Sequence, residues 1–152
     1  MNVRPERNGW RDEEISRRHR TWGWNCPAVD LDFVMCEYNH AKPCALVEYK
    51  HAKVTSIDIK HPTYRAIAAL ADGYRHGPLP AFIAIYDPET WAFKVICMND
   101  TAREHFGERE FRVLTEQEFG RDLYAMRKLV LTSRDAEVIG TLNDSRDWNT
   151  NT

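Results

Sequence analysis

The most informative segment of this chain runs from Asp30 to Lys50 and reads DLDFVMCEYNHAKPCALVEYK. Two apolar runs, residues 30–38 and 44–50, flank turn-forming residues at 39–43, and this pattern predicts two strands joined as a hairpin. Apolar side chains occur on both faces of each strand, so we expect the hairpin to lie inside a sheet that is covered on both sides. Charged residues open the first strand and close the second, and they mark one end of the hairpin.

Outward from this hairpin, the sequence predicts further helices and strands. Acid-before-base pairs at i,i+4 indicate a helix over residues 11–21. Pro62, directly after His61, is typical of a helix start, and Gly77 is typical of a stop. The remaining predicted elements are strands over 81–86 and 91–98, a short helix over 99–106, an extended segment over 111–114, and a helix opened by a capping box at Thr115 and Glu118.

These elements predict an α/β protein with a mixed central sheet flanked by helices. The order of the strands within the sheet does not follow from their order in the chain. The length of 152 residues suits one domain, which we place over residues 1–132. Residues 133–152 are rich in Asp, Asn, Ser and Thr, and we expect a loosely held tail there.

Composition excludes several classes of protein. The chain has 21 basic and 23 acidic residues, so its net charge of −2 gives no overall attraction to nucleic acid or to an anionic membrane. No apolar run approaches the ~18 residues of a membrane-spanning helix, and the first residues lack the apolar core of a secretory signal. The four cysteines form no C-x-x-C pair. We therefore expect a cytoplasmic protein with reduced thiols and no membrane partner.

Four polar residues stand at the outer end of the predicted hairpin: Asp30, Asp32, Glu48 and Lys50. Side chains alternate along a strand with period two, so the two aspartates share one face, as do Glu48 and Lys50. If the two cysteines nearest the turn face each other, Asp32 lies opposite Glu48 and Asp30 lies opposite Lys50. All four groups then converge at one end of one face, and a slip of the register by one residue would separate them.

Carboxylates gathered at the end of an apolar hairpin are costly unless a cation neutralises them. Mg²⁺ suits such a place, because proteins bind it with one or two carboxylates together with water and substrate phosphate. Lys50 beside the metal would stabilise phosphate charge or help to orient and deprotonate a water molecule. These groups suit metal-assisted hydrolysis of a phosphodiester. The alternative is a partly buried ion-pair network of Asp32, Glu48 and Lys50 with a structural role.

The sequence PAVDLD at residues 27–32, followed after a short hairpin by EYK at residues 48–50, resembles the PD-(D/E)XK nuclease superfamily. This superfamily includes many restriction endonucleases, Holliday-junction resolvases and repair nucleases. The resemblance implies a restriction-endonuclease-like core of helix, three strands, helix and strand, with the active site on the second and third strands. The predicted element order is similar from about residue 10 to residue 100, provided that a further short strand lies near the first helix.

The resemblance also implies the catalytic residues. Glu48 and Lys50 match the E-x-K triplet of the family, and the upstream aspartate is either Asp32 or Asp30. Asp32 directly precedes the apolar run, as the aspartate of the family usually does, so we prefer Asp32, Glu48 and Lys50 as the catalytic set. Asp30 follows the proline after two intervening residues, whereas the family often has proline and aspartate adjacent.

The metal implied by the resemblance is Mg²⁺ or Mn²⁺, held by Asp32 and Glu48 with Asp30 as a further ligand. Many members also place an acidic residue of the first helix near the metal, and Glu14 or Glu13 stands at a suitable position. The alternative for these two glutamates is a surface ion pair with a neighbouring arginine.

Five basic residues lie close in sequence to the predicted site. Arg17, Arg18 and Arg20 form a cluster on the first predicted helix, and His51 and Lys53 directly follow the E-x-K triplet. Such residues bind the phosphates that flank a scissile bond. The alternative interpretations are a solvated helix face for the arginines and an ordinary surface position for the histidine.

The sequence thus predicts a metal-dependent nuclease, with an endonuclease favoured, whose substrate is DNA, with RNA as the open alternative. A domain of this size without a recognition module suggests a homodimer or a larger protein partner. One alternative is a nuclease-fold protein that does not cut and binds nucleic acid or protein. Another is an unrelated α/β scaffold whose carboxylates are structural. A role in a phage, a mobile element or defence would fit an isolated domain of this kind, by analogy of fold alone.

Overall fold

The computed structural model describes residues 13–22 and 28–131 of the chain. The elements along it are α1 (Glu13–Trp22), β1 (Phe33–Glu37), β2 (Lys42–His51), α2 (Pro62–Asp72), β3 (Ala81–Tyr86), β4 (Phe93–Cys97), α3 (Asp100–Phe106), a 3-10 turn η1 (Gly107–Arg109) and α4 (Glu116–Leu129). The predicted tail at 133–152 lies outside the described residues, as do residues 1–12, 23–27 and 132 of the single predicted domain.

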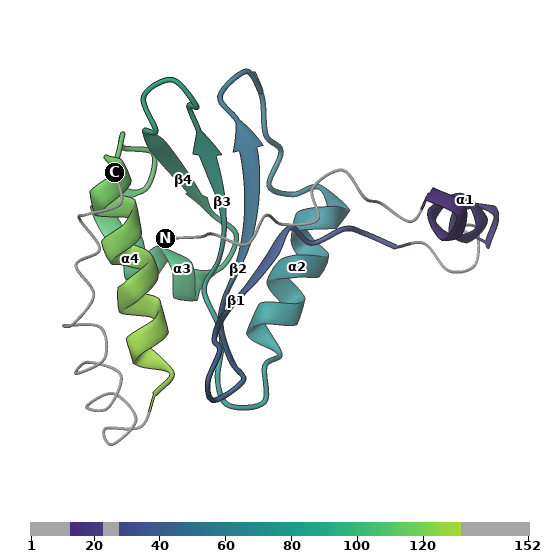
Figure 1. The fold of residues 1–152 in the computed structure, drawn as a ribbon, viewed down its shortest axis with the longest axis horizontal. Coiled ribbons are helices and arrows are strands. Elements are labelled where there is room, and N and C mark those ends of the chain that lie inside the picture. The colour runs from purple at the N-terminus through teal and green to yellow at the C-terminus, as the bar shows by residue number, and fades with distance from the viewer. Residues whose placement is uncertain (1–12, 23–27, 132–152) are drawn as a thin grey trace.

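One four-stranded sheet in the order β1-β2-β3-β4 forms the centre of the molecule (Figure 1). The β1–β2 and β3–β4 pairs are antiparallel hairpins, and β2 and β3 are parallel. Because parallel strands need a crossover connection, α2 links the end of β2 to the start of β3. The predicted α/β class with a mixed sheet flanked by helices is confirmed.

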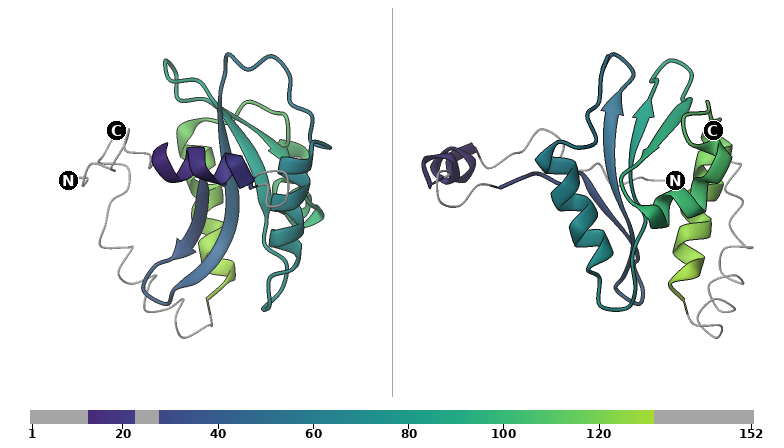
Figure 2. Two further views of the ribbon diagram at one scale, coloured as in Figure 1. Left: turned by 90° about the vertical axis from the view of Figure 1, so that its right-hand side faces the viewer. Right: turned by 180° about the vertical axis from the view of Figure 1, so that it is seen from behind.

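Helices cover both faces of this sheet, and each face has its own apolar core (Figure 2). On one face, α2 packs Ile67 and Ala71 against Leu46 of β2 and Ile83 of β3. On the other face, Phe106 of α3 and Phe119 and Met126 of α4 share a core with residues of β2, β3 and β4, including Val47, Phe82 and Val95. The middle strands β2 and β3 are therefore buried from both sides, which explains their nearly continuous apolar sequences.

The helix starts follow the predicted signals. His61 caps α2, because its side chain accepts a hydrogen bond from the Thr63 amide, and Pro62 takes the first helical position. At α4 the predicted capping box is confirmed: the Glu118 amide donates to the Thr115 hydroxyl at 3.1 Å, and the Thr115 amide donates to the Glu118 carboxylate at 3.4 Å.

Strand β1 lies at the edge of the sheet, and here the predicted burial is wrong. Phe33 is 43% exposed and Val34 is 53% exposed, whereas β2 is covered on both faces as expected. The difference arises because β1 has a neighbour on one side only and does not lie beneath α2. The extended segment at 111–114 is also reduced to a single bridge, between Leu114 and Phe93.

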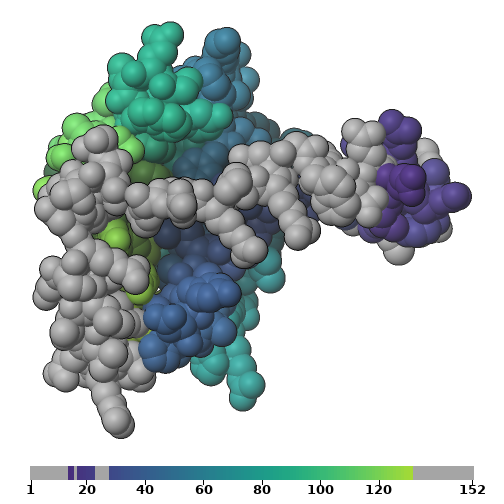
Figure 3. Space-filling view, in the orientation of Figure 1, coloured from purple at the N-terminus to yellow at the C-terminus, as the bar shows by residue number. Residues whose placement is uncertain are grey.

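Helix α1 stands apart from the sheet in Figure 1 and in the right view of Figure 2, and Figure 3 shows it as a projection. Ile15 is 51% exposed and Trp22 is 49% exposed, so the apolar stripe of this helix is not packed against the sheet. Within residues 13–22 and 28–131, no strand precedes β1 and no helix is both long and apolar enough to cross a membrane.

Candidate functional site

The register of the β1–β2 hairpin brings Asp32 opposite Glu48. Phe33 pairs with Val47 and Val34 pairs with Leu46, so the next pair outward joins residues 32 and 48, as predicted. The assumed pairing of Cys36 with Cys44 is wrong, because an irregularity after Met35 shifts Cys36 onto Pro43. This shift lies on the turn side of the hairpin and leaves the register at the charged end unchanged.

One hydrogen bond joins Asp32 to Glu48, and a second joins Asp32 to Tyr49, the residue after Glu48. The backbone amide of Asp32 donates to Glu48 Oε1 at 2.9 Å, and the backbone amide of Tyr49 donates to Asp32 Oδ2 at 2.8 Å. Each carboxylate is therefore oriented by the backbone of the opposite strand. The pair extends the β1–β2 ladder by side-chain contacts at the point where the backbone pairing of β1 ends.

Glu48 is an acidic residue inside an apolar layer. It is only 4% exposed, and across the sheet it pairs with Ile83 of β3, which is completely buried. Burial raises the pKa of the Glu48 carboxyl, and the neighbouring Asp32 charge raises it further, while the Asp32 amide and Lys50 act in the opposite direction. The net pKa lies above the ordinary value for glutamate, which means that this site would be stabilised by an additional positive charge.

Lys50 follows Glu48 on the same face of β2 and is half-buried. It pairs with Ile85 of β3, and Ile85 in turn pairs with Lys94 of β4. Side-by-side residues in a sheet point to the same face, so Lys50 and Lys94 share a face and lie two strand spacings apart, about 10 Å. Lys94 is exposed and was missed in the sequence, because its proximity to Lys50 depends on the strand order.

The other predicted metal ligands do not complete a cluster with Asp32 and Glu48. Among the described residues, no group of three or more His, Cys, Asp or Glu side chains is arranged to hold a metal ion. Asp30 is exposed in the segment before β1, and Glu14 lies on α1, away from the sheet. Glu13 begins the same helix. The structure thus brings together two of the predicted acidic residues and leaves Asp30 and Glu14 outside their pair.

The predicted nucleic-acid contacts fall into two groups. Arg17, Arg18 and Arg20 are exposed on α1, and Figure 3 shows that this helix projects away from the sheet that carries Glu48. His51 ends β2, and the Lys53 amide donates to His51 Nδ1 at 3.0 Å, so these two residues lie directly beyond Lys50. Only the second group adjoins the Asp32–Glu48 pair.

A second buried carboxylate lies at the opposite end of the hairpin and was not predicted. Glu37 is 1% exposed and accepts hydrogen bonds from His40 at 2.7 Å and from Arg127 of α4 at 3.3 Å. Burial alone would raise its pKa, but the hydrogen bonds from His40 and Arg127 outweigh burial and hold the pKa below the ordinary value. This carboxylate is fully partnered within the protein, so it joins the hairpin to α4.

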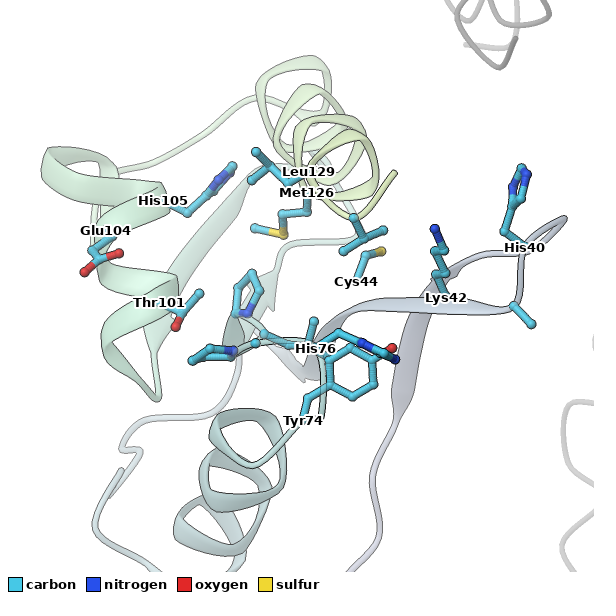
Figure 4. A pocket seen from close by; sticks show the side chains of 16 residues that line it. His40, Lys42, Cys44, Tyr74, His76, Thr101, Glu104, His105, Met126 and Leu129 are labelled. Atoms are coloured by element: carbon cyan, nitrogen blue, oxygen red, sulfur yellow. The ribbon is translucent and has the colours of Figure 1, made fainter. Parts of the chain in front are cut away.

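A cavity of about 830 Å³ adjoins this second end of the sheet (Figure 4). Its walls come from the start of β2, the segment after α2, and helices α3 and α4, and they include Lys42, Cys44, His76, His105 and Met126. His105 Nε2 lies 3.4 Å from Asp122 Oδ1, and Arg109 also pairs with that carboxylate. Lys42 and Glu48 stand toward opposite ends of β2, so the cavity is separate from the Asp32–Glu48 pair.

No protein-family model, no curated protein and no solved structure matches this chain.

Proposed function

We propose that this protein is a metal-dependent nuclease of the PD-(D/E)XK type, which hydrolyses phosphodiester bonds in DNA at the end of the β1–β2 hairpin. The observation that carries the proposal is a pair of hydrogen bonds: the Asp32 amide donates to Glu48 Oε1 at 2.9 Å, and the Tyr49 amide donates to Asp32 Oδ2 at 2.8 Å. It places two carboxylates together at one strand end, with Lys50 two residues beyond on the face of Glu48.

The donor set suits a hard divalent cation. Mg²⁺ and Mn²⁺ prefer carboxylate oxygens, and Mg²⁺ commonly takes one or two of them and completes its shell with water and phosphate. Asp32 and Glu48 would hold the ion. A buried glutamate whose pKa is raised by burial and by a second carboxylate is a group that such an ion would stabilise. When bound, the ion would activate water and offset charge on the phosphate.

The protein side chains have distinct parts in this proposal. The Tyr49 amide orients Asp32, and the Asp32 amide orients Glu48, so both carboxylates are positioned before substrate arrives. Lys50 would stabilise the negative charge that develops on the scissile phosphate. Lys94, on the same face two strands away, would bind a neighbouring phosphate of the same nucleic-acid strand.

The fold is compatible with this proposal. The order β1, β2, α2, β3, with β3 parallel to β2, corresponds to the strand, strand, helix, strand part of the core that the sequence resemblance implies. The two strands that carry Asp32, Glu48 and Lys50 are then the second and third strands of that core. The first strand of that core has no counterpart among residues 13–22 and 28–131.

A second candidate is a protein of the same fold that binds nucleic acid or protein without cutting. It is favoured by one observation: within the described part of the chain, the two carboxylates are joined by no third His, Cys, Asp or Glu ligand. Under this alternative, Asp32 and Glu48 fasten the edge strand to β2, and Lys50 and Lys94 contribute only positive charge.

A metal titration followed by a cleavage assay separates the two candidates. For the nuclease, Mg²⁺ or Mn²⁺ raises the melting temperature of the wild-type protein, and supercoiled plasmid is nicked in the presence of the metal. For the binding protein, plasmid stays intact with either metal over the same range of protein concentration. If the metal neither raises the melting temperature nor supports nicking, both the proposed metal site and the proposed nuclease activity are contradicted.

A further inference from the structure

Three aromatic rings form a row beside the proposed site. His51 at the end of β2 pairs in register with Tyr86 at the end of β3, and their ring centroids are 5.4 Å apart in an edge arrangement. Trp91, in the β3–β4 turn, stacks on Tyr86 with centroids 6.1 Å apart and ring planes only 13° from parallel. We call these three residues the aromatic row.

Trp91 occupies a backbone position that suits glycine. Its φ is +53°, in the left-handed region that bulky residues rarely adopt. The turn is held there by hydrogen bonds: the Trp91 amide donates to the Asp87 carbonyl at 2.7 Å, and the Asp87 amide donates to the Ala92 carbonyl at 3.0 Å. A tryptophan at such a position is strained, and strained residues cluster at functional sites.

Trp91 is only partly packed. Trp91 is 47% exposed, so nearly half of a large apolar side chain faces solvent, while Tyr86 stacks against the ring. Glycine or asparagine would fit the turn without strain. The geometry thus presents an aromatic surface at the edge of the molecule.

The aromatic row lies at the same end of the sheet as the proposed catalytic residues. His51 directly follows Lys50 in β2, and its partner Tyr86 directly follows Ile85, the partner of Lys50. Figure 1 shows the end of β2 and the β3–β4 turn side by side at this end, and Figure 2 agrees. Alternation along the strands puts the side chains of the row on the opposite face from Lys50, so the two adjoin each other only at the strand end.

We propose that Trp91 and Tyr86 form a stacking platform for an unpaired base of single-stranded nucleic acid, next to the phosphate at Lys50. This inference rests on the proposed nuclease function and names its substrate class. Aromatic side chains bind single strands of any sequence, because every base has a π-face that can stack on them. A base inside a duplex is already stacked between its neighbours and cannot reach such a platform. Lys53, whose amide donates to His51, supplies positive charge beside the row for the backbone of the same strand.

The test uses Trp91→Gly in the full-length protein, because glycine removes the ring and relieves the strained φ. Binding of fluorescein-labelled single-stranded and blunt duplex oligonucleotides of matched length is measured by anisotropy in Ca²⁺, for both DNA and RNA. We expect single-strand affinity to fall about tenfold or more, as loss of stacking with one base predicts, and duplex affinity to change less than twofold.

Phe111→Gly is the matched control. Phe111 is also an exposed aromatic residue with positive φ, at +64° and 64% exposed, but its amide bonds to Val95 in the middle of β4, away from the aromatic row. It should bind both probes as wild type does. Trp91→Asn, which tolerates the same φ, should behave like the glycine variant, and Trp91→Phe should recover most of the affinity. Circular dichroism melts check that each variant is folded.

Equal single-strand affinity in wild type and Trp91→Gly would overturn the platform, as would an equal loss in the Phe111 control or for the duplex. The nuclease proposal is judged separately, by plasmid nicking. If wild type cuts and Trp91→Gly binds single strands normally, only the platform is wrong. If wild type does not cut and Trp91→Gly loses single-strand binding, the stacking platform is supported and the nuclease proposal is wrong.

Discussion

Glu37 and Glu48 are both buried in the β1–β2 hairpin, and their surroundings shift their carboxyl pKa values in opposite directions. Glu37 is satisfied by His40 and Arg127, so its pKa is lowered despite burial. Glu48 has a second carboxylate as its neighbour, so burial and repulsion together raise its pKa. The first arrangement is that of a structural ion pair, and the second is the arrangement on which the proposed metal site rests.

Replacement of Glu37 by glutamine should destabilise the protein by roughly 1–3 kcal/mol at pH 7, because it weakens hydrogen bonds made to a buried charge. The lowered pKa gives the sign of the pH dependence. The stabilising effect is full above the ordinary glutamate value and is lost as pH falls through the lower folded-state pKa. Urea denaturation of both proteins from pH 7 to pH 3 measures this. A variant as stable as wild type at pH 7 would contradict the structural role.

Replacement of Glu48 by glutamine should have the opposite effect on the metal-free protein. Because the folded-state pKa is raised, the ionised group costs stability, and this cost grows as pH rises from the ordinary value through the raised pKa. Glutamine keeps an acceptor for the Asp32 amide and removes the charge. At pH 7 we therefore expect the variant to be as stable as wild type or more stable, with the difference shrinking toward pH 4. Thermal melts without metal over this pH range would contradict the account if the variant were the less stable protein at pH 7.

The two lysines on one face of the sheet should separate binding from catalysis. Lys50→Ala should slow cleavage on the order of 10²-fold while leaving the thermal shift with Mg²⁺ intact. Lys94→Ala should raise KM and leave kcat nearly unchanged, because in the proposed function this residue would bind a phosphate away from the reacting one. Lys128→Ala, in the last turn of α4, serves as the control and should change neither constant. An unchanged KM in the Lys94 variant would mean that Lys94 does not bind the substrate.

Helix α1 offers a test of its own. If Arg17, Arg18 and Arg20 follow a nucleic-acid backbone, the triple alanine variant should bind more weakly and with a shallower salt dependence, by about one unit of slope for each lost phosphate contact. Affinity measured between 50 and 300 mM salt gives the slope directly. The same slope in wild type and variant would mean that these three arginines make no phosphate contacts.

Much of the fold could be predicted because its signals are local. The bounds of β3 and the capping box at Thr115 match the sequence-based expectations, since both depend on neighbouring residues. Likewise Asp32 meets Glu48 as predicted, although the assumed cysteine pairing was displaced by the irregularity after Met35. That agreement holds because the irregularity lies between the turn and Met35. The residue pairs between Met35 and the site keep the regular register.

The unpredicted features depend on contacts between distant segments. Exposure of β1 follows from its place at the sheet edge, and the proximity of Lys94 to Lys50 follows from the strand order, which the chain order does not give. Glu37 was missed because its partner Arg127 lies far away in the sequence. The one local signal was His40, three residues after Glu37 across the turn, where a histidine can pair with a strand-end carboxylate.

The most direct test of the proposed function is metal-dependent nicking of supercoiled plasmid by wild type, Asp32→Asn, Glu48→Gln and Asp30→Asn, each with Mg²⁺ and with Mn²⁺. The Asp32–Glu48 pair predicts cleavage by wild type and by the Asp30 variant, since Asp30 lies outside that pair. It predicts loss of cleavage in the other two variants, on the order of 10²-fold or more, with partial recovery at higher metal concentration. Cleavage by Glu48→Gln at the wild-type rate would contradict the account.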